Sequence, residues 1–223
     1  MPDLITSGVV FTTPPSLPRG RHDLSREQVT AAQRERMLIA ATELLADTGH
    51  RGFGVREICS RAAVSRANFY SCFADKDACV SAAYDRFIAV CLERLSKVDS
   101  SGDWADCVRG LVTAYLGTLH SDLASARAFQ VEMDALGREA RGRRRAAIVR
   151  LAEFVRDLRE RRFPDTAGQV PLSAYLGAIY ALRQIASDVL DERDEPELLS
   201  LVPELTGWLT RMTEPAPTME WTR

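Results

Sequence analysis

Apolar residues recur every three or four positions through most of the chain, a spacing that places them along one face of an α-helix. Beyond Trp104 no segment shows the strict alternation of apolar and polar residues that is typical of a half-buried strand. The pattern therefore predicts an all-α fold of about nine helices. The predicted helices span residues 25–48, 55–62, 65–73, 75–97, 104–119, 122–136, 138–163, 171–190 and 197–212.

Clusters of glycine, proline and serine divide the chain into four parts. Residues 1–24 contain four prolines and no sustained apolar period, so we expect a mobile arm. A small helical domain is predicted over 25–76 and a larger helical domain over 77–213, followed by a loose tail over 214–223. The helix that starts at Asp75 links the two domains, because its first turn lies in the small one and its far end in the large one.

The stretch from Val55 to Lys76 reads VREICSRAAVSRANFYSCFADK, which predicts two short helices joined by a tight turn. A helix-turn-helix has this form: its first helix braces across the DNA backbone and its second lies in the major groove. Ser65 is a suitable N-cap for the second helix. Val64, Phe69 and Phe73 are the expected buried positions.

The residues left on the outer face of the second helix have side chains suited to DNA. Arg66 and Asn68 can read guanine and adenine edges, and Ala67 can contact a thymine methyl group. Tyr70 and Lys76 can reach phosphates, the latter from the first turn of the next helix. The candidate DNA-binding residues are Gly54, Arg56, Ser65, Arg66, Ala67, Asn68, Tyr70 and Lys76.

The distribution of charge along the chain is compatible with a local DNA-binding face but does not establish one. The whole chain has a formal net charge of −2, which argues against a histone-like binder. Residues 51–76 carry five basic and two acidic side chains. Two short helices with a polar face also occur in many proteins that do not bind DNA. A helical protein-interaction module without specific DNA binding is therefore the alternative hypothesis.

The segment from Arg34 to Asp85 resembles the DNA-binding domain of the TetR family of bacterial regulators. The residues that carry the resemblance are Met37, Leu38, Ala40, Ala41, Leu44, Leu45, Gly49, Val55, Ile58, Ala62, Val64, Ser65, Phe69, Tyr70, Phe73 and Lys76. The resemblance implies a homodimer that binds a palindrome-like operator as double-stranded DNA. It also implies a helical regulatory domain that binds a small-molecule effector, with repression as the default.

Three positions depart from the family pattern. Gly54 stands where a serine or threonine is usual, Ala63 where the turn often has glycine, and Cys72 where histidine is common. Alanine in a left-handed turn costs on the order of 1 kcal/mol, which a packed domain tolerates. The missing hydroxyl and imidazole are potential phosphate donors, so these departures affect DNA affinity more than the fold.

The C-terminal half resembles the regulatory domain of the same family. Large apolar side chains with a few polar partners suggest an effector pocket for a mainly hydrophobic or aromatic molecule, and ordinary core packing is the alternative for each. These candidates are Trp104, Tyr115, His120, Phe129, Glu132, Met133, Phe154 and Arg183.

The last two helices carry more apolar surface than a terminal pair can bury alone, which predicts a four-helix dimer interface. Its candidates are Leu172, Tyr175, Leu176, Ile179, Leu205, Trp208 and Leu209.

Other classes of function find little support in the sequence. No nucleophile elbow, glycine-rich phosphate loop or Ser/His/Asp set is present, and three histidines without ligand spacing predict no metal and no cofactor. The five cysteines form no CxxC pair, which is typical of free thiols in a reducing cytosol. No signal peptide or membrane span is evident, so we expect a cytoplasmic protein that is not an enzyme.

Overall fold

The computed structural model describes residues 9–14 and 25–214, and within these residues it contains helices but no strand. The predicted all-α fold is therefore confirmed. Its α-helices are α1 (Arg26–Thr48), α2 (Val55–Ala62), α3 (Arg66–Cys72), α4 (Lys76–Ser96), α5 (Trp104–His120), α6 (Leu123–Ala126), α7 (Arg138–Arg162), α8 (Leu172–Glu192) and α9 (Val202–Thr213). Shorter helical turns are η1 (His50–Gly52), the π-helix η2 (Arg127–Val131), η3 (Glu132–Leu136), η4 (Pro164–Thr166) and η5 (Leu198–Leu201).

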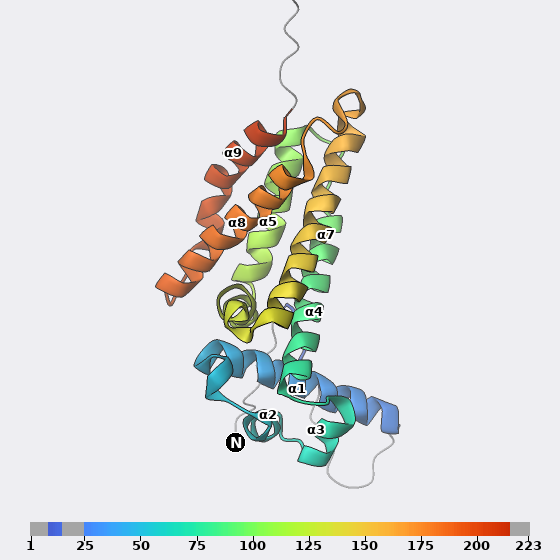
Figure 1. Cartoon of the computed structure of the whole chain (residues 1–223), viewed down its shortest axis with the longest axis vertical. Helices are drawn as coiled ribbons and strands as arrows, with labels where there is room; N and C mark the ends of the chain where they lie inside the picture. The colour runs from blue at the N-terminus through green and yellow to red at the C-terminus, as the bar shows by residue number, and fades with distance from the viewer. Residues whose placement is uncertain (1–8, 15–24, 215–223) are drawn as a thin grey trace, which may run out of the picture.

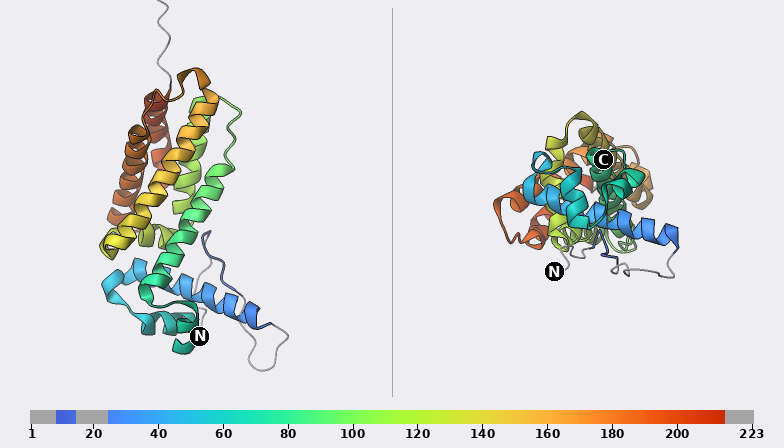
Figure 2. Two further views of the ribbon diagram at one scale, coloured as in Figure 1. Left: turned by 45° about the vertical axis from the view of Figure 1, so that its right-hand side comes forward. Right: turned by 90° about the horizontal axis from the view of Figure 1, so that it is seen from below.

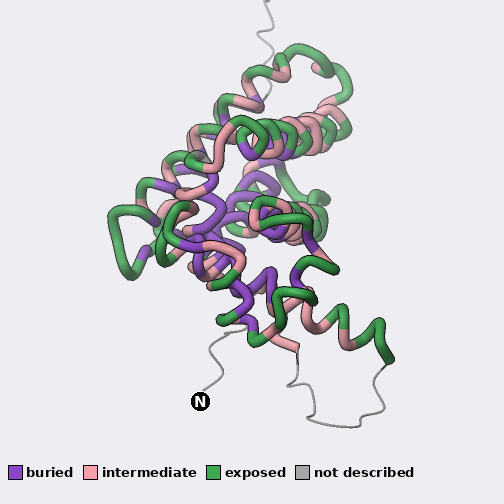
Figure 3. Tube along the Cα trace, turned by 60° about the horizontal axis from the view of Figure 1, so that its bottom comes forward, coloured by how far each residue is buried: buried purple, intermediate pink, exposed green. Residues whose placement is uncertain are grey.

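The helices form two layers along the long axis of the molecule (Figure 1). Helices α1, α2 and α3 lie together at one end, and α4 runs from them into a bundle with α5, α7, α8 and α9. Within the bundle α5 packs on α4 and α9, while α7 packs on α4 and α8. Figure 3 shows that the buried parts of these helices meet inside the molecule. One connected apolar core therefore extends from α1 to α9.

Local sequence signals account for the ends of the first helices. Ser25 and Gln28 form a capping box: the Ser25 hydroxyl accepts from the Gln28 amide at 3.1 Å, and the Gln28 side chain accepts from the Ser25 amide at 2.8 Å. Gly49 ends α1 at a φ of 65°, which favours glycine. Asp75 caps α4 by accepting from the Ala78 amide at 2.7 Å.

Two predicted helices of the larger domain differ from the structure. Residues 122–136 do not form one helix: α6 is four residues long, and η2 and η3 follow it. The carbonyl of Gln130 in η2 instead accepts from Arg183 and Ser187 of α8. The last helix begins at Val202 rather than at 197, with Pro203 in its first turn, where a missing amide hydrogen costs nothing.

Residues 9–14 lie within the stretch for which we expected a mobile arm, yet they pack on the body of the protein (Figure 2, dark blue). Val10 and Phe11 are only 4% and 3% exposed. The Val10 amide donates to Asp122 at 3.3 Å, and the Arg86 guanidinium lies 5.6 Å from the centre of the Phe11 ring. This short segment therefore bridges α4 and the start of α6. The rest of the predicted arm, residues 1–8 and 15–24, and the predicted tail from 215 lie outside the described residues.

We expect Phe11→Ala to lower the free energy of unfolding by about 2–4 kcal/mol, because it removes a buried aromatic ring from the junction of the two layers. Urea denaturation followed by circular dichroism measures this change. Thr12→Ala is the matched control, because Thr12 is exposed in the same segment. Equal stabilities of the two variants would show that the segment does not pack on the body in solution.

Candidate DNA-binding surface and ligand cavity

The turn between α2 and α3 is built from local hydrogen bonds. Ala63 adopts the left-handed conformation, with a φ of 54° and a ψ of 44°. The amide of Val64 donates to the carbonyl of Cys59 at 3.0 Å, and that of Ala63 to the carbonyl of Ser60 at 3.3 Å. These two bonds form a Schellman motif, which is the usual end of a helix before a sharp change of direction. The predicted left-handed alanine is thus present.

Helix α3 starts immediately after this turn and is fixed from beneath by aromatic residues. The Ser65 hydroxyl accepts from the Asn68 amide at 3.1 Å, as expected of an N-cap. Phe69 and Phe73 are buried, with their ring centroids 5.7 Å apart. The opposite face carries the candidate DNA-binding side chains: Arg66, Ala67 and Tyr70 are exposed and Asn68 is partly exposed. An outward polar face on a rigid helix is what major-groove binding requires.

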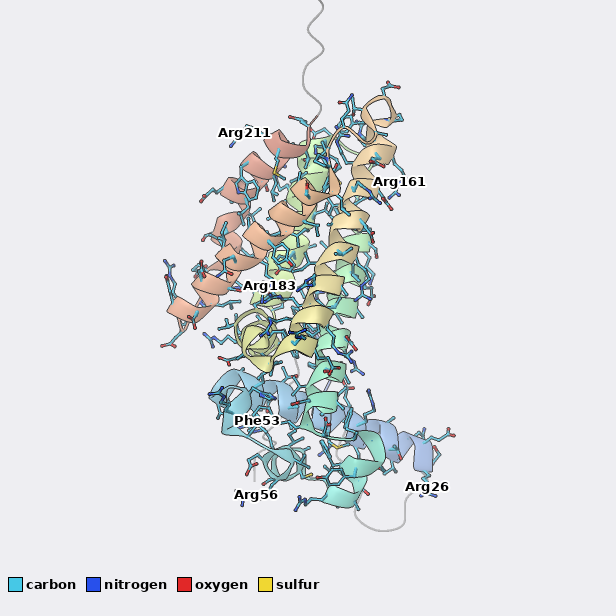
Figure 4. The ribbon with its side chains drawn as sticks, viewed as in Figure 1. Arg26, Phe53, Arg56, Arg161, Arg183 and Arg211 are labelled. Carbon is cyan, nitrogen blue, oxygen red and sulfur yellow. The ribbon has the colours of Figure 1, made fainter. Side chains whose placement is uncertain are left out.

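The start of α2 lies beside this face. The side chain of Arg56 is exposed and points away from the body at the lower end of the molecule (Figure 4). Its Nε donates to Glu57 at 2.8 Å, and the other Glu57 oxygen accepts from the Gly54 amide at 2.9 Å. The hydrogen bond from Arg56 lowers the pKa of Glu57. Because Glu57 caps the helix through the backbone of Gly54, α2 is held at its start without the usual serine or threonine.

Lys76 has a structural role that its predicted phosphate contact did not include. Its Nζ donates to the carbonyls of His50 at 2.6 Å and Phe53 at 3.1 Å. The same ammonium lies 4.9 Å from the centre of the Phe53 ring. Lys76 therefore fixes the loop between α1 and α2 to the start of α4. Loss of DNA binding on its substitution would not by itself identify a phosphate contact.

We expect Ala63→Gly to raise the free energy of unfolding by about 0.5–1 kcal/mol, because glycine adopts the left-handed conformation without a Cβ penalty. Ala67→Gly, in the exposed face of α3, should lower it by a similar amount, about 1 kcal/mol. Thermal or urea unfolding of the two variants beside the parent protein tests this opposition. A destabilising effect of both substitutions would contradict the structure of the turn.

The second site is an elongated cavity inside the bundle, with a volume of about 90 Å³. Its middle is apolar and is formed by α4, α5, α7 and α8. At the end far from the DNA-binding layer lie Trp104 and Tyr175; at the near end lie Gln130, Arg144 and Arg183. The full lining is Tyr84, Phe87, Ile88, Cys91, Leu95, Trp104, Val108, Leu111, Val112, Tyr115, Phe129, Gln130, Arg144, Ala147, Ile148, Leu151, Val155, Tyr175, Ala178, Ile179, Leu182, Arg183, Leu209 and Thr213.

Gln130 is the centre of a buried hydrogen-bond network at the near end. Its side-chain oxygen accepts from the Tyr115 hydroxyl at 2.9 Å. Its main-chain carbonyl accepts from Arg183 Nη2 at 2.7 Å and from the Ser187 hydroxyl at 2.9 Å. Burial raises the pKa of Tyr115, so its hydroxyl stays protonated and donates. Figure 4 shows Arg183 above the coiled segment between α5 and α7.

Four of the eight predicted effector residues line this cavity: Trp104, Tyr115, Phe129 and Arg183. Of the other four, Met133 is fully buried and Phe154 is partly buried, but neither is part of the lining. His120 is exposed at the end of α5, and Glu132 lies beside Gly49, at the contact with the DNA-binding layer. These last four residues were chosen for the chemistry of their side chains. Whether a residue lines the cavity depends instead on which face of its helix it occupies.

Sequence reasoning missed three polar or aromatic residues of the near end: Tyr84, Gln130 and Arg144. Tyr84 is spaced three or four residues from Val80, Phe87 and Ile88 of α4, so helical periodicity places it on the inner face of that helix. Arg144 is one of ten arginines between Arg138 and Arg162, and periodicity alone does not distinguish the one that faces inward. Gln130 depends on the π-helix, which no local pattern predicts.

The predicted dimer residues divide into two groups. Leu172, Leu176, Ile179 and Trp208 are partly exposed on α8 and α9. Tyr175, Leu205 and Leu209 are buried within the chain, so the partly exposed group is the better placed to contact a second copy. The last two helices do not pack on each other alone, because α9 packs its apolar face on α5 of the same chain. Tyr180, which is 41% exposed, was not predicted.

The residues around the helix-turn-helix have a counterpart among known protein families. The model of the family described as bacterial regulatory proteins, tetR family, matches residues 38–83, which run from α1 through the helix-turn-helix into α4. Residues 38–83 therefore carry the N-terminal domain typical of that family. The sequence-based resemblance to that family is confirmed over these residues, which contain the helix-turn-helix formed by α2 and α3. No curated protein matches the chain significantly by sequence.

Solved structures share the fold of this chain over most of its length. The fatty acid degradation regulator FadR from Bacillus halodurans is 17% identical, covers 79% of this chain and 94% of its own, and has a TM-score of 0.68. FadR from Bacillus subtilis, in complex with stearoyl-CoA, is 14% identical and covers 80% of this chain and 98% of its own, with a TM-score of 0.68. A TetR-like transcriptional regulator from Rhodococcus sp. RHA1 is 20% identical, covers 86% and 100%, and has a TM-score of 0.62. At these identities the similarity establishes the fold.

Two further observations concern other kinds of site. Within the described residues no group of histidine, cysteine and carboxylate side chains is arranged to hold a metal ion. No helix in the part of the chain that the structure describes is long and apolar enough to cross a membrane.

We expect Tyr115→Phe to lower the free energy of unfolding by about 1–2 kcal/mol, because it leaves the buried Gln130 side chain without its donor. Tyr175→Phe is the matched control: its buried hydroxyl has no hydrogen-bond partner among the described residues, so its loss should be neutral or slightly stabilising. Urea denaturation of both variants gives the comparison. An equal cost at the two positions would mean that the Gln130 network does not contribute to stability.

Proposed function

We propose that the protein is a ligand-responsive transcriptional repressor that binds a palindrome-like operator as a homodimer and is released by a small, mainly hydrophobic molecule. Helix α4 carries this proposal. Its first turn holds the loop before α2 through Lys76, and its second half lines the cavity from Tyr84 to Leu95. A molecule that displaces the second half of α4 therefore also displaces the DNA-binding layer.

The size of the cavity supports release on binding. Ligand sites usually measure roughly 300–1,000 Å³, whereas this cavity measures about 90 Å³. A ligand of ordinary size can enter only if the surrounding helices move apart. Since packed interiors are bistable rather than continuously deformable, this movement is a suitable origin for two states of different DNA affinity.

A second contact between the layers lies at η2. This π-helix packs on α1 as well as on α8, and its Gln130 belongs to the near end of the cavity. Glu132, the next residue after η2, lies against Gly49 at the end of α1. One of its carboxylate oxygens is 3.1 Å from the point where a Cβ atom on Gly49 would be. The effector site therefore reaches the DNA-binding layer through η2 as well as through α4.

The outer face of α8 and α9 supports the homodimer. Three large apolar side chains are exposed in the described chain, and two of them, Tyr180 and Leu199, lie on this side of the bundle. The partly exposed Leu172, Leu176 and Trp208 share it. Pairing two copies through these helices gives a four-helix contact. A two-fold axis then places two α3 helices about one DNA turn, roughly 34 Å, apart.

The coupling between effector and operator is limited by the difference in effector affinity between the two states. A coupling free energy of about 1–3 kcal/mol is typical, and it must act equally in both directions. Operator binding should accordingly weaken effector binding by the same factor. The rival hypothesis, a helical interaction module without specific DNA binding, predicts no coupling between operator binding and effector binding.

Selection of bound duplexes from a random DNA library, with the purified protein, tests the operator hypothesis. We expect an inverted repeat to be enriched and Arg66→Ala to weaken its binding by about tenfold or more, because a bidentate base contact contributes about 1–3 kcal/mol. Arg161→Ala is the control, since Arg161 is exposed at the far end of the bundle (Figure 4). Absence of any enriched sequence with a folded protein, or equal effects of the two variants, would contradict sequence-specific binding through α3.

A further inference from the structure

The near end of the cavity combines positive charge with an otherwise apolar interior. Arg144 of α7 and Arg183 of α8 both line it. The helices run in opposite directions, and these two residues are the last lining positions of each toward the DNA-binding layer. Two arginines therefore line the same end of a long apolar space. Such an end favours a negatively charged group.

The surroundings of the two arginines fit an anion. Burial lowers the pKa of Arg144, and the nearby charge of Arg183 lowers it further. Tyr84 lies within electrostatic range of both guanidinium groups, and burial raises the pKa of its hydroxyl. The hydroxyl thus remains a neutral donor beside the two cations. An anion placed here would accept hydrogen bonds from the two guanidinium groups and the Tyr84 hydroxyl.

The length and lining of the rest of the cavity suit a linear apolar chain once the surrounding helices have moved apart. The lining of α7 runs from Arg144 to Val155, a rise of roughly 16 Å at 1.5 Å per residue. An extended alkyl chain advances roughly 1.3 Å per carbon, so about twelve carbons span this length. At the far end the lining is aromatic, with Trp104 and Tyr175.

We propose that the effector is an amphipathic anion, with its acidic group bound between Arg144 and Arg183 and a linear apolar tail directed toward Trp104. This inference deepens the proposed function and rests on it, because it assigns the chemical class of the effector. A fatty carboxylate and an acyl thioester of an anionic carrier share this chemistry. Arg183 also donates to the carbonyl of Gln130 in η2, so an anion that attracts Arg183 acts on the segment that contacts α1.

The test is direct binding to the full chain without DNA, by isothermal titration calorimetry below the micellar concentration of each probe. The probes are dodecanoate, dodecanoyl-CoA and dodecanol, which differ at the head but share the tail. We expect at least one anionic probe to bind about tenfold or more tightly than dodecanol, as charge-assisted hydrogen bonds predict. Whether dodecanoate or dodecanoyl-CoA shows the larger preference identifies the source of the anion.

Arg144→Met should remove this preference by lowering the affinity for the anionic probe to about that for dodecanol, and the circular dichroism spectrum checks that the variant is folded. Arg145→Met is the matched control, because Arg145 is the next residue of α7, is exposed and does not line the cavity; it should leave the preference intact. Arg144→Lys retains the charge and should keep part of the preference.

Three results would overturn the proposal: equal affinity for dodecanol and both anions, equal effects of Arg144→Met and Arg145→Met, or no binding of any probe. Because these measurements contain no DNA, they are independent of operator selection. Failure to bind an amphipathic anion would leave a repressor with a different effector. Failure to select an operator would leave a binding site for an amphipathic anion without a DNA response.

Discussion

Helix α4 has to bury its apolar face in two different surroundings. Near its start Cys79 and Val80 belong to the core shared with α1, and farther along Phe87 and Cys91 face the interior of the bundle. Burial of apolar area is the dominant favourable term in both places, and one rigid helix satisfies both at once. The two layers are therefore mechanically connected by a continuous backbone. The packing of residues 9–14 against Arg86 and Asp122 adds a contact at the same junction.

Polar interactions at this junction are few but buried, which makes them sensitive to change. The carbonyl of Gln130 accepts from two side chains of α8 and its side chain from α5. Leaving such a group without a partner costs about 1–3 kcal/mol. That amount is comparable with a typical allosteric coupling free energy. A ligand that rearranges this network can thus shift the equilibrium between two states without disrupting the core.

The fold and the DNA-binding surface could be predicted because their signals are local. The Ser65 cap, the left-handed Ala63 and the buried Phe69 each follow from neighbouring residues or from helical periodicity. The cavity could be predicted only in part. Periodicity shows that Tyr175 and Leu209 are buried but not whether a second copy or the same chain covers them. Likewise, the sequence does not distinguish Arg144 from the other arginines of α7. Only the position of α8 beside it identifies Arg144 as the one that lines the cavity.

The central claim is that the cavity and the DNA-binding surface are coupled through α4 and η2. Its most direct test is the fluorescence anisotropy of a labelled selected operator, titrated with protein at increasing concentrations of dodecanoate or dodecanoyl-CoA. The account predicts that the anion lowers operator affinity by about 5- to 150-fold at saturation, and that operator DNA lowers the affinity for the anion by the same factor. An anion that binds in the cavity while operator affinity stays constant would contradict it.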